Sequence, residues 1–430
     1  MKLKGKLSRS ERNWIMYDVA NSSYGLIIMT AIMPIYYKGY IAGGVGETVS
    51  TSDWGFANSA AGLVVAVMAP FLGAVADAKR NKKAFLGWFM VVGILATAAL
   101  SLTAPGMRLA TLSIYALSLI AFTGSCVFYD SLLVDVTSTK RMDWISGAGY
   151  AWGYVGGGIP YVFCIALIWL GGLVDNKILM VKLSFVITAL WWLLFSLPVL
   201  FGIKQKYVLS EQPGTVADAL KNLWATLKKI RRYRNVALFL PAYFLYIDGV
   251  DTIIQMAVPY GRDIGMTDTL LMLTVLGLQF LAFPFALLYG RLAAYYSARK
   301  MLFAAIGVYM VITFLGYLLP SINNIGVKTG IFFLLAFLIA TSQGGLQALS
   351  RSFYSRIIPR EQAAEFFGFY NVFGKFATIL GPLLVALAGR WLGHARYGIL
   401  SLSFLFLAGG ICLLWVKEPP RKVRPAVVGH

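Results

Sequence analysis

The stretch GAVADAKRNKK, from Gly73 to Lys83, follows a long apolar segment and ends in a run of basic residues. A stretch of similar layout, GRLAAYYSARK from Gly290 to Lys300, follows another apolar segment 217 residues later. Glycine, alanine and the terminal basic positions coincide in the two stretches. A loop repeated at this distance predicts a chain of two similar halves, an arrangement typical of transporters.

A second repeat involves glycines inside apolar segments. Gly147 and Gly153 keep the same six-residue spacing as Gly368 and Gly374. Glycines in a membrane helix allow close packing against a neighbouring helix. The shared spacing is a second sign of two repeated halves. Gly153, Gly156, Gly157 and Gly158, which precede Pro160, are expected at close helix packing or a hinge rather than at a ligand site.

The sequence around these repeats is that of a membrane protein with many spans. Of the 430 residues, 59% are hydrophobic and 13% are charged. The apolar residues form blocks of about 20, the length that crosses the hydrocarbon core of a bilayer. Twelve spans are expected, at approximately 14–37, 54–76, 84–103, 109–134, 145–170, 181–203, 236–260, 269–293, 301–319, 329–349, 366–388 and 397–416.

The longest polar segment divides these spans into six and six. The sequence therefore predicts an all-α membrane protein with twelve transmembrane helices in two pseudo-symmetric six-helix bundles, 1–203 and 236–430, joined by 204–235. Apolar residues recur at helical spacing in the joining segment and basic residues accompany them. This pattern predicts an amphipathic helix on the cytoplasmic membrane surface, and a partner-binding helix is the alternative.

The basic residues of the chain, which give a formal net charge of +20, are distributed unevenly. The side that holds the N-terminus and every even-numbered connection carries 29 of the 38 Lys and Arg, the opposite side carries eight, and Lys375 lies within a span. By the positive-inside rule both termini are cytoplasmic. The charge therefore indicates membrane topology, and no nucleic-acid partner is expected.

Several motifs resemble a known family. The stretch Gly73 to Lys83 resembles the loop-2/3 motif of the major facilitator superfamily, in which a glycine, an aspartate (here Asp77) and basic residues form a cytoplasmic latch. YDVANSSYG at 17–25, YIDGVDTI at 246–253, and GGLQALSRSFYSRIIP followed by EFFGFY and GK at 344–375 resemble its vacuole-effluxer-like, autophagy-related branch, whose prokaryotic members form an "unknown major facilitator" family. The resemblance implies the major facilitator fold, and transport of a solute such as an amino acid.

The chain departs from the family pattern in its charged positions. Ala294 stands where the repeat would place an aspartate, so only the first latch, through Asp77, is intact. Asp251 and Asp130 stand where the family often has glutamine and asparagine. These two residues add negative charge inside the spans and bear on the choice of substrate or ion.

Two carboxylates in span seven are the leading candidates for function. Asp248 and Asp251 are three residues apart, hence on roughly one helical face, and a charge at the bilayer centre costs at least about 2.5 kcal/mol. Lys375 in span eleven can form a structural pair with one of them. Alternatively the aspartates bind substrate or a proton, and a pair that breaks during transport does both. Asp248 is the first choice for the proton-coupling carboxylate.

Other spans offer polar groups at helical spacing. Asp18 and Asn21 share a face of span one, where they form a polar solute site or a network between helices. The resemblance places Asp18, Asp130 and Asp248 at the wall of a central cavity. The further candidates for substrate or proton binding are Gln343, Gln347, Asn371 and Lys375, and those for a gate or latch are Asp77, Arg80, Asp135 and Arg351.

Two classes of function fit this pattern unequally. Two repeated halves favour a secondary transporter that moves a small polar solute by alternating access, coupled to protons, with amino-acid export as the first candidate. The alternatives are an exporter of cationic drugs, polyamines or lipid-like solutes, a passive channel or scramblase, and, least favoured, a membrane enzyme. His394 and His430 are the two histidines and no nucleotide motif occurs, so no enzyme activity, metal or cofactor is expected.

The expected setting of the protein follows from its topology. We expect an integral protein of a prokaryotic plasma (inner) membrane, with lipid, a small solute and protons as its partners. Cys126, Cys164 and Cys412 lie inside spans and predict no disulfide. The chain is expected to work as a monomer.

Overall fold

The computed structural model describes residues 6–45, 47–207, 233–263, 265–376, 380–392 and 395–418. These residues are almost entirely helical and contain no strand, which confirms the all-α fold. The helices of the first half are α1 (Arg9–Tyr24), α2 (Ile32–Tyr36), α3 (Glu47–Ala78), α4 (Lys82–Ala99), α5 (Arg108–Ser131), α6 (Leu133–Val136), α7 (Met142–Leu173) and α8 (Lys177–Gly202). Those of the second half are α10 (Arg234–Asp263), α11 (Asp268–Tyr295), α12 (Ala298–Leu318), α13 (Ile325–Ile357), α14 (Ala363–Phe376), α15 (Leu380–Leu392) and α16 (Ala395–Leu414).

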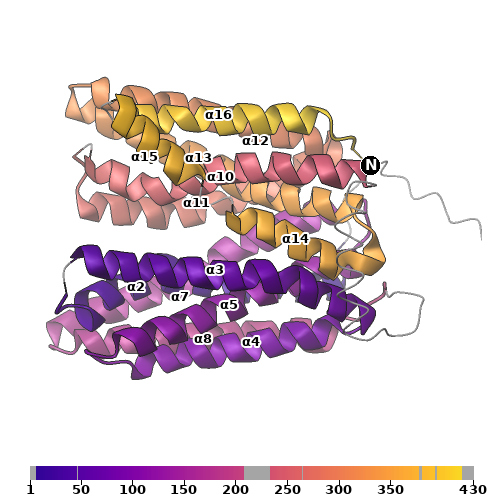
Figure 1. The fold of residues 1–430 in the computed structure, drawn as a ribbon, viewed down its shortest axis with the longest axis horizontal. Helices are drawn as coiled ribbons and strands as arrows, with labels where there is room; N and C mark the ends of the chain where they lie inside the picture. The colour runs from indigo at the N-terminus through magenta and orange to yellow at the C-terminus, as the bar shows by residue number, and fades with distance from the viewer. Residues whose placement is uncertain are drawn as a thin grey trace, which may run out of the picture.

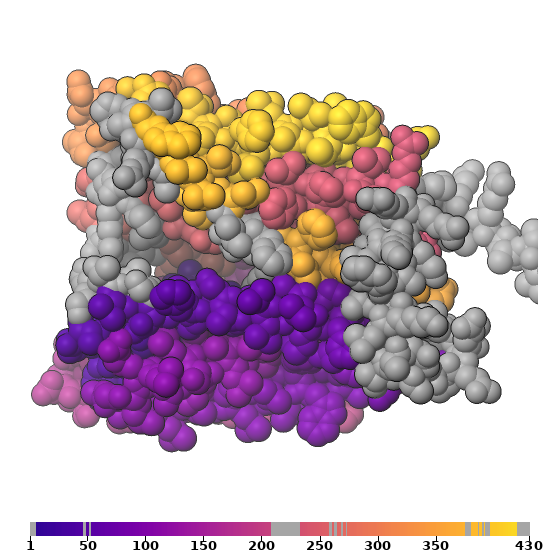
Figure 2. Space-filling model, in the orientation of Figure 1, coloured from indigo at the N-terminus to yellow at the C-terminus, as the bar shows by residue number. Residues whose placement is uncertain are grey.

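The two halves form two bundles that lie side by side. Helices up to α8 make one layer and helices from α10 onward make the other (Figure 1). The space-filling view shows the same division, with the orange α14 against the first half (Figure 2). The two-bundle fold is therefore confirmed. The amphipathic helix expected in 204–235 falls mostly on 208–232, outside the described residues.

Within the described residues, eleven helical segments are long and apolar enough to cross a membrane. The first contains α1 and α2 and two π-helical stretches: η1 (Gly25–Ala31) joins the two helices, and η2 (Tyr37–Ile41) follows α2. The place of the eleventh expected span, 366–388, is taken by α14 and α15, which lie on either side of residues 377–379. Each of these two helices is shorter than a full crossing, which is why they are not among the eleven.

Several helices extend beyond the spans expected from hydropathy. The first crossing begins at Arg9 instead of residue 14, because Ser8 and Glu11 form a capping box. The Ser8 hydroxyl accepts from Glu11 N at 3.2 Å, and the Glu11 carboxylate accepts from Ser8 N at 2.8 Å. Likewise α13 runs to Ile357, eight residues past the expected end. Hydropathy marks only the part of a helix that lies in hydrocarbon.

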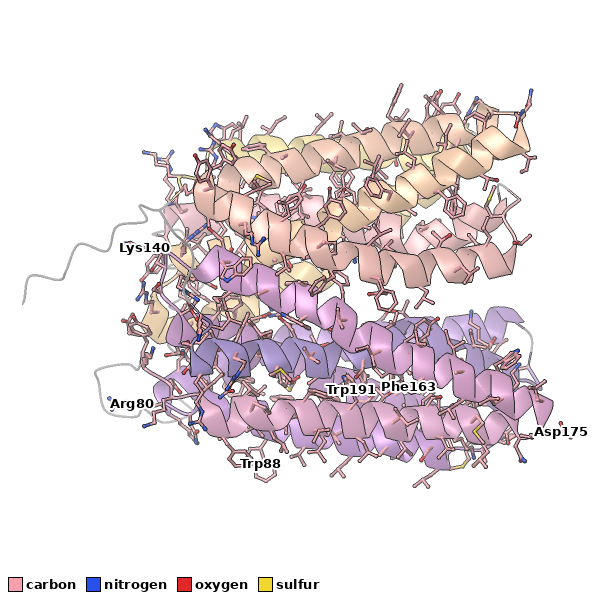
Figure 3. The ribbon with its side chains drawn as sticks, turned by 180° about the vertical axis from the view of Figure 1, so that it is seen from behind. Arg80, Trp88, Lys140, Phe163, Asp175 and Trp191 are labelled. Carbon is pink, nitrogen blue, oxygen red and sulfur yellow. The ribbon has the colours of Figure 1, made fainter. Side chains whose placement is uncertain are left out.

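The molecule has two distinct ends, and the one at which α1 begins is called the basic end below. Arg80, between α3 and α4, and Lys140, before α7, lie at this end, and Asp175, between α7 and α8, lies at the other (Figure 3). Between the ends the outer surface is apolar: Val67 of α3 and Leu194 of α8 are 72% and 62% exposed. Such a belt suits contact with lipid tails.

Two helix crossings join the halves near the basic end. We call the contact of α3 with α14 the first seam and that of α7 with α11 the second seam. In the first seam a Cβ on Gly73 would lie 2.3 Å from Ala364 O, and one on Gly368 would lie 2.5 Å from Pro70 Cα. Only glycine fits such a close approach of two backbones.

The second seam repeats this geometry with the corresponding glycines. A Cβ on Gly147 would lie 2.9 Å from Ala286 O, and one on Gly290 would lie 3.0 Å from Asp143 O. The glycines that repeat in the sequence, Gly73 with Gly290 and Gly147 with Gly368, are therefore the positions at which helix backbones of the two halves approach most closely in the seams. The hydrogen bonds and ion pairs that join the halves within the described residues also lie toward this end. They include the contacts of Asp18 with Arg351, of Asp143 with Arg356 and of Asp77 with Glu365.

Candidate functional site

A buried cluster of three charges spans the two halves. Arg351 of α13 places its Nη2 3.0 Å from Asp18 Oδ2 of α1 and its Nη1 3.1 Å from Asp130 Oδ1 of α5. The three side chains, called the Arg351 cluster below, are 3%, 10% and 14% exposed. The second half thus supplies the cation, and the first half supplies both carboxylates.

Neighbouring groups fix the guanidinium in place. Its Nε donates to Ser146 Oγ at 2.9 Å and its Nη2 donates to Ser146 O at 3.2 Å. The rings of Trp14, Tyr129 and Tyr150 surround it, with centroids 4.6, 5.5 and 4.5 Å from Cζ. Aromatic faces attract a guanidinium most strongly where water is excluded. Arg351 is therefore held by α7 and by aromatic rings as well as by the two carboxylates.

The cluster carries unequal charge. One guanidinium faces two carboxylates, so when both are ionised the site holds one excess negative charge away from water. Buried charge without a partner is costly inside a membrane protein. A bound proton or a cationic group would neutralise the excess, and the cluster can therefore act as a binding site for either.

The cluster lies near the basic end rather than at the middle of the bundle. Arg351 is six residues before the end of α13, about 9 Å along the helix axis. Further polar groups continue from it toward the opposite end: Asn21 is one turn beyond Asp18, and Gln347 and Gln343 are one and two turns beyond Arg351. All three side chains are buried or half-buried.

Two of the polar groups beyond the cluster lack hydrogen bonds. Gln343 Oε1 and the Tyr154 hydroxyl are buried, and neither has a hydrogen-bond partner among the described residues. Tyr154 packs against α13 beside the residue that follows Gln343, because a Cβ on Gly344 would lie 2.7 Å from the Tyr154 ring. Buried polar atoms normally find a partner. These atoms are therefore suited to bind a polar ligand or water.

Asp248 belongs to a different set of contacts. It is fully buried on α10, and both of its oxygens lie 2.9 Å from Gly381 N in the first turn of α15. A helix N-terminus favours a carboxylate. The expected pair of Asp248 with Lys375 stays a prediction, because the Lys375 side chain lies outside the described part. Asp251, one turn further along α10, is half-buried.

Asn371 of α14 is occupied within its own helix. Its side chain is half-buried and donates to Phe367 O at 3.0 Å. Its expected role in binding substrate remains a prediction.

The first seam contains the expected latch aspartate. Asp77 accepts from Glu365 N at 2.9 Å, at the start of α14, and lies 3.3 Å from Lys82 Nζ. The same ammonium is 3.8 Å from Asp135, whose other oxygen accepts from Lys206 N at 2.7 Å. Lys82, Asp77 and Asp135 are at most 1% exposed. Asp77 and Asp135 therefore meet through a buried lysine.

Sequence reasoning singled out Arg80 and missed Lys82. Arg80 is exposed in the turn that ends α3, with a left-handed backbone at φ 57°. Lys82 opens α4 and points inward. Nothing in a run of four basic residues distinguishes the buried one, since its position depends on how α4 packs against α3 and α5. The gating role of Arg80 stays a prediction.

A second missed group joins α7 to α13. Asp143 Oδ2 lies 2.6 Å from Arg356 Nη1, and its Oδ1 accepts from Ser352 Oγ at 2.7 Å. Glu11 forms a comparable pair with Arg141 within the first half, at 2.9 Å. The spacing of Ser8 and Glu11 is a capping-box signal and could have identified Glu11. No comparable signal precedes Asp143.

The second half also contains an apolar cavity of about 90 Å³. It lies among α10, α11, α13 and α16, with Met256, Leu278, Phe332 and Leu402 in its wall. Tyr260, also in the wall, donates its hydroxyl to Gly316 O at 2.6 Å. None of the described residues that line this cavity is charged, so it is not suited to a polar solute.

Comparison with known proteins identifies the family. The sequence model of the family described as "Vacuole effluxer Atg22 like" matches residues 38–139 and 134–424. An uncharacterized MFS-type transporter, YxiO of Bacillus subtilis, is 40% identical over 417 residues, which cover 96% of each chain. Autophagy-related protein 22 of Kluyveromyces lactis is 26% identical over 366 residues, covering 76% of this chain and 70% of its own.

Solved transporters share the fold. The proton:xylose symporter XylE superposes with a TM-score of 0.74 at 12% identity, covering 96% of each chain. FucP, solved in its outward conformation, gives a TM-score of 0.71 at 13% identity, covering 96% of this chain and 98% of its own. These relatives and neighbours are transporters rather than enzymes, as expected from the sequence. The chain therefore belongs to the vacuole effluxer Atg22-like family of major facilitator transporters.

Proposed function

We propose that the protein is a proton-coupled secondary transporter of a small zwitterionic solute, with amino acids as the first candidates. The observation that carries the proposal is the Arg351 cluster, in which a cation from one half lies between two carboxylates from the other. Both seams lie at the same end, so the cluster forms part of a closed gate. Opening this end requires Arg351 to leave Asp18 and Asp130.

Separation of the halves leaves charges that need new partners. Removing one partner of a buried ion pair costs about 3–5 kcal/mol, because the other charge stays buried. A zwitterion supplies both replacements: its ammonium can bind Asp18 or Asp130, and its carboxylate can bind Arg351. The second aspartate would then take a proton. In this mechanism the solute and the proton together replace the bonds that hold the gate closed.

The polar groups beyond the cluster support a route for this solute. Asn21, Gln347 and Gln343 continue toward the opposite end, and Gln343 Oε1 and Tyr154 have unused hydrogen-bonding capacity within the described residues. A solute that enters from the opposite end would meet these groups before it reaches the charges. They would replace part of its hydration shell.

An exporter of organic cations or polyamines is the second candidate, because the excess negative charge of the cluster also suits a cation. Such a solute has no carboxylate for Arg351 and would compete with the guanidinium instead. Asp248 and Asp251 are proposed as a further proton or cation site in span seven, with Lys375 as the expected partner. A lipid-like solute fits these charged groups less well.

The proposed orientation follows the basic residues. Both termini face the cytoplasm of a prokaryotic cell, and the basic end is the cytoplasmic gate. Export then begins with a solute that binds when this end is open. We propose that the monomer carries out the whole cycle, since each half supplies part of the cluster.

The test is a transport measurement in proteoliposomes on a solid-supported membrane. Currents are recorded for a panel of amino acids and organic cations at several pH values, for the parent, Asp130→Asn and Asp248→Asn. Amino-acid currents that depend on pH in the parent and lose this dependence in Asp130→Asn would support the proposal. Loss in Asp248→Asn alone would move the proton site to span seven.

A matched control is Asp53→Asn, because Asp53 pairs with Arg108 at the opposite end and is partly exposed. This variant should transport like the parent. Radiolabelled counterflow detects transport by an electroneutral cycle, which gives no current. The zwitterion proposal is overturned if no amino acid gives current or counterflow while organic cations give clear signals.

A further inference from the structure

A second polar pocket lies on the surface of the second half, at the basic end. Its volume is about 340 Å³, and it lies where α10 begins and where α13 and α16 end. Six residues line it and define the headgroup pocket discussed here: Tyr233, Arg234, Asn235, Ile357, Trp415 and Lys417. It is separate from the Arg351 cluster and from the apolar cavity, with which it shares no residue.

The wall of this pocket is held by two reciprocal hydrogen bonds. Asn235 Nδ2 donates to Lys417 O at 3.1 Å, and Lys417 N donates to Asn235 Oδ1 at 3.2 Å. These bonds tie the first turn of α10 to the segment that follows α16. The two residues on which the positive charge of the pocket depends, Arg234 and Lys417, are therefore kept close together before any ligand binds.

The charge of the pocket is positive. Arg234 and Lys417 are both exposed, and neither forms an ion pair with another described residue. The neighbouring acid, Glu418, turns toward α12: it accepts from Ser297 and from Ala298 N, and lies 3.9 Å from Arg356. Its carboxylate is thus engaged away from the pocket. An anion is the ligand that two such cations favour.

The depth of the pocket indicates where that anion comes from. Trp415 directly follows the apolar α16 and is 59% exposed, and Leu414 beside it is 57% exposed. Tryptophan at the end of a membrane helix lies at the level of the lipid headgroups, where Lys and Arg attract anionic lipids. The pocket therefore combines an apolar, lipid-facing wall with two cations at headgroup depth.

We infer that this pocket binds the phosphate-bearing headgroup of an anionic phospholipid. Arg234 and Lys417 hold the phosphate oxygens, Tyr233 and Asn235 offer further polar contacts, and Trp415 lies against the glycerol and upper acyl region. Ile357, which ends α13, forms the side nearest the second half's core. Bound lipid joins the ends of α10, α13 and α16, and Arg356 next to Ile357 already pairs with Asp143 of the first half.

Native mass spectrometry of the purified full chain tests this inference. The protein in detergent is titrated with phosphatidylglycerol, with phosphatidylcholine, and with inorganic phosphate in separate arms. The parent should retain phosphatidylglycerol in preference to phosphatidylcholine and should not retain phosphate at comparable concentrations. In the double variant Arg234→Gln with Lys417→Gln, affinity for phosphatidylglycerol should fall about 30-fold, since each basic residue contributes a factor of about five.

Two further variants keep the result interpretable. Lys79→Gln with Lys300→Gln removes the same charge from exposed positions at the same end, and should change lipid affinity less than about threefold. Arg234→Lys with Lys417→Arg keeps the charge and should retain the lipid. Equal loss in the Lys79 and Lys300 control, no preference over phosphatidylcholine, or retention of inorganic phosphate alone would each overturn the inference. These outcomes do not depend on the transported solute.

Discussion

The two seams share their backbone geometry and differ in their charges. Gly73 and Gly368 allow α3 and α14 to meet, and Gly290 and Gly147 do the same for α11 and α7. In the first seam Asp77 reaches across to the N-terminus of α14. Ala294 holds the corresponding position of the second seam, 217 residues later.

In the second seam the carboxylate lies on α7 rather than on α11, the helix that corresponds to α3. Asp143 lies in the first turn of α7 and pairs with Arg356 and Ser352 of α13, so it also joins the two halves. The cation of the first seam, Lys82, belongs to the same half as Asp77, whereas Arg356 comes from the opposite half. The fold therefore requires the glycines in both seams, while the charges can be placed differently in each.

The largest effect is expected at the Arg351 cluster, which also joins the two halves. Arg351→Gln leaves Asp18 and Asp130 buried without their cation, and we expect a loss of stability of about 3–5 kcal/mol, measured by thermal or denaturant unfolding in detergent. Adding Asp130→Asn to this variant should restore part of the loss. If Arg351→Gln is as stable as the parent, the seams alone hold the end closed.

Alanine in place of a seam glycine should have a larger effect in the first seam than in the second. In Gly73→Ala the new Cβ meets Ala364 O at 2.3 Å, whereas in Gly290→Ala the nearest atom, Asp143 O, is 3.0 Å away. Forcing extra volume into a tight contact costs about 1–3 kcal/mol. Transport, measured by solute counterflow, should therefore fall more than tenfold in Gly73→Ala and only a few-fold in Gly290→Ala. Equal effects would mean that the seams are equally tight.

Removing one carboxylate from each seam compares their charges. Asp143→Asn leaves Arg356 without its 2.6 Å partner across the halves, while Asp77→Asn leaves Lys82 beside Asp135. We expect about 1–3 kcal/mol for Asp143→Asn and less for Asp77→Asn. Hydrogen exchange should rise around 140–150 in the first variant and around 360–370 in the second. A rise at both seams in either variant would show that they open together.

The smallest effect is expected when the missing aspartate is restored. Ala294→Asp places a carboxylate at the position that corresponds to Asp77, near the first turn of α7, where Asp143 already supplies negative charge. The attraction of the helix N-terminus, about 0.3–1 kcal/mol, is partly offset by this like charge. We expect stability to change by less than about 0.5 kcal/mol in thermal unfolding. A clear stabilisation would indicate that Asp143 does not replace the latch.

Much of the architecture could be predicted from the sequence because it depends on local composition. Twenty-residue apolar blocks must form helices in lipid, where no other partner exists for the backbone. Repeated motifs at Gly73 and Gly290, and the shared spacing of Gly147 and Gly368 with their partners, predicted two similar halves. That these glycines are the close contacts between the halves is shown only by the structure. Apolar composition predicts the start of the first helix at residue 14, five residues after its actual start at Arg9, since the capping box at Ser8 lies outside the apolar block.

The candidate site was harder to predict, because its members come together from distant parts of the chain. Asp18, Asp130 and Arg351 were each singled out by polarity at helical spacing, yet the first two were assigned to the substrate and the third to a gate. Their contacts place all three in one cluster. Asp248, the first choice from sequence, meets the start of α15.

The sequence by itself determined which segments enter the membrane, how the halves repeat, and which charged residues need an explanation. These properties depend on the transfer of side chains between water and lipid, which each segment expresses on its own. Only the tertiary structure decided which charges meet, that Lys82 is the buried lysine, and that Arg351 lies between Asp18 and Asp130. Such pairings depend on helix rotation and packing across more than 300 residues of chain, and no local pattern encodes them.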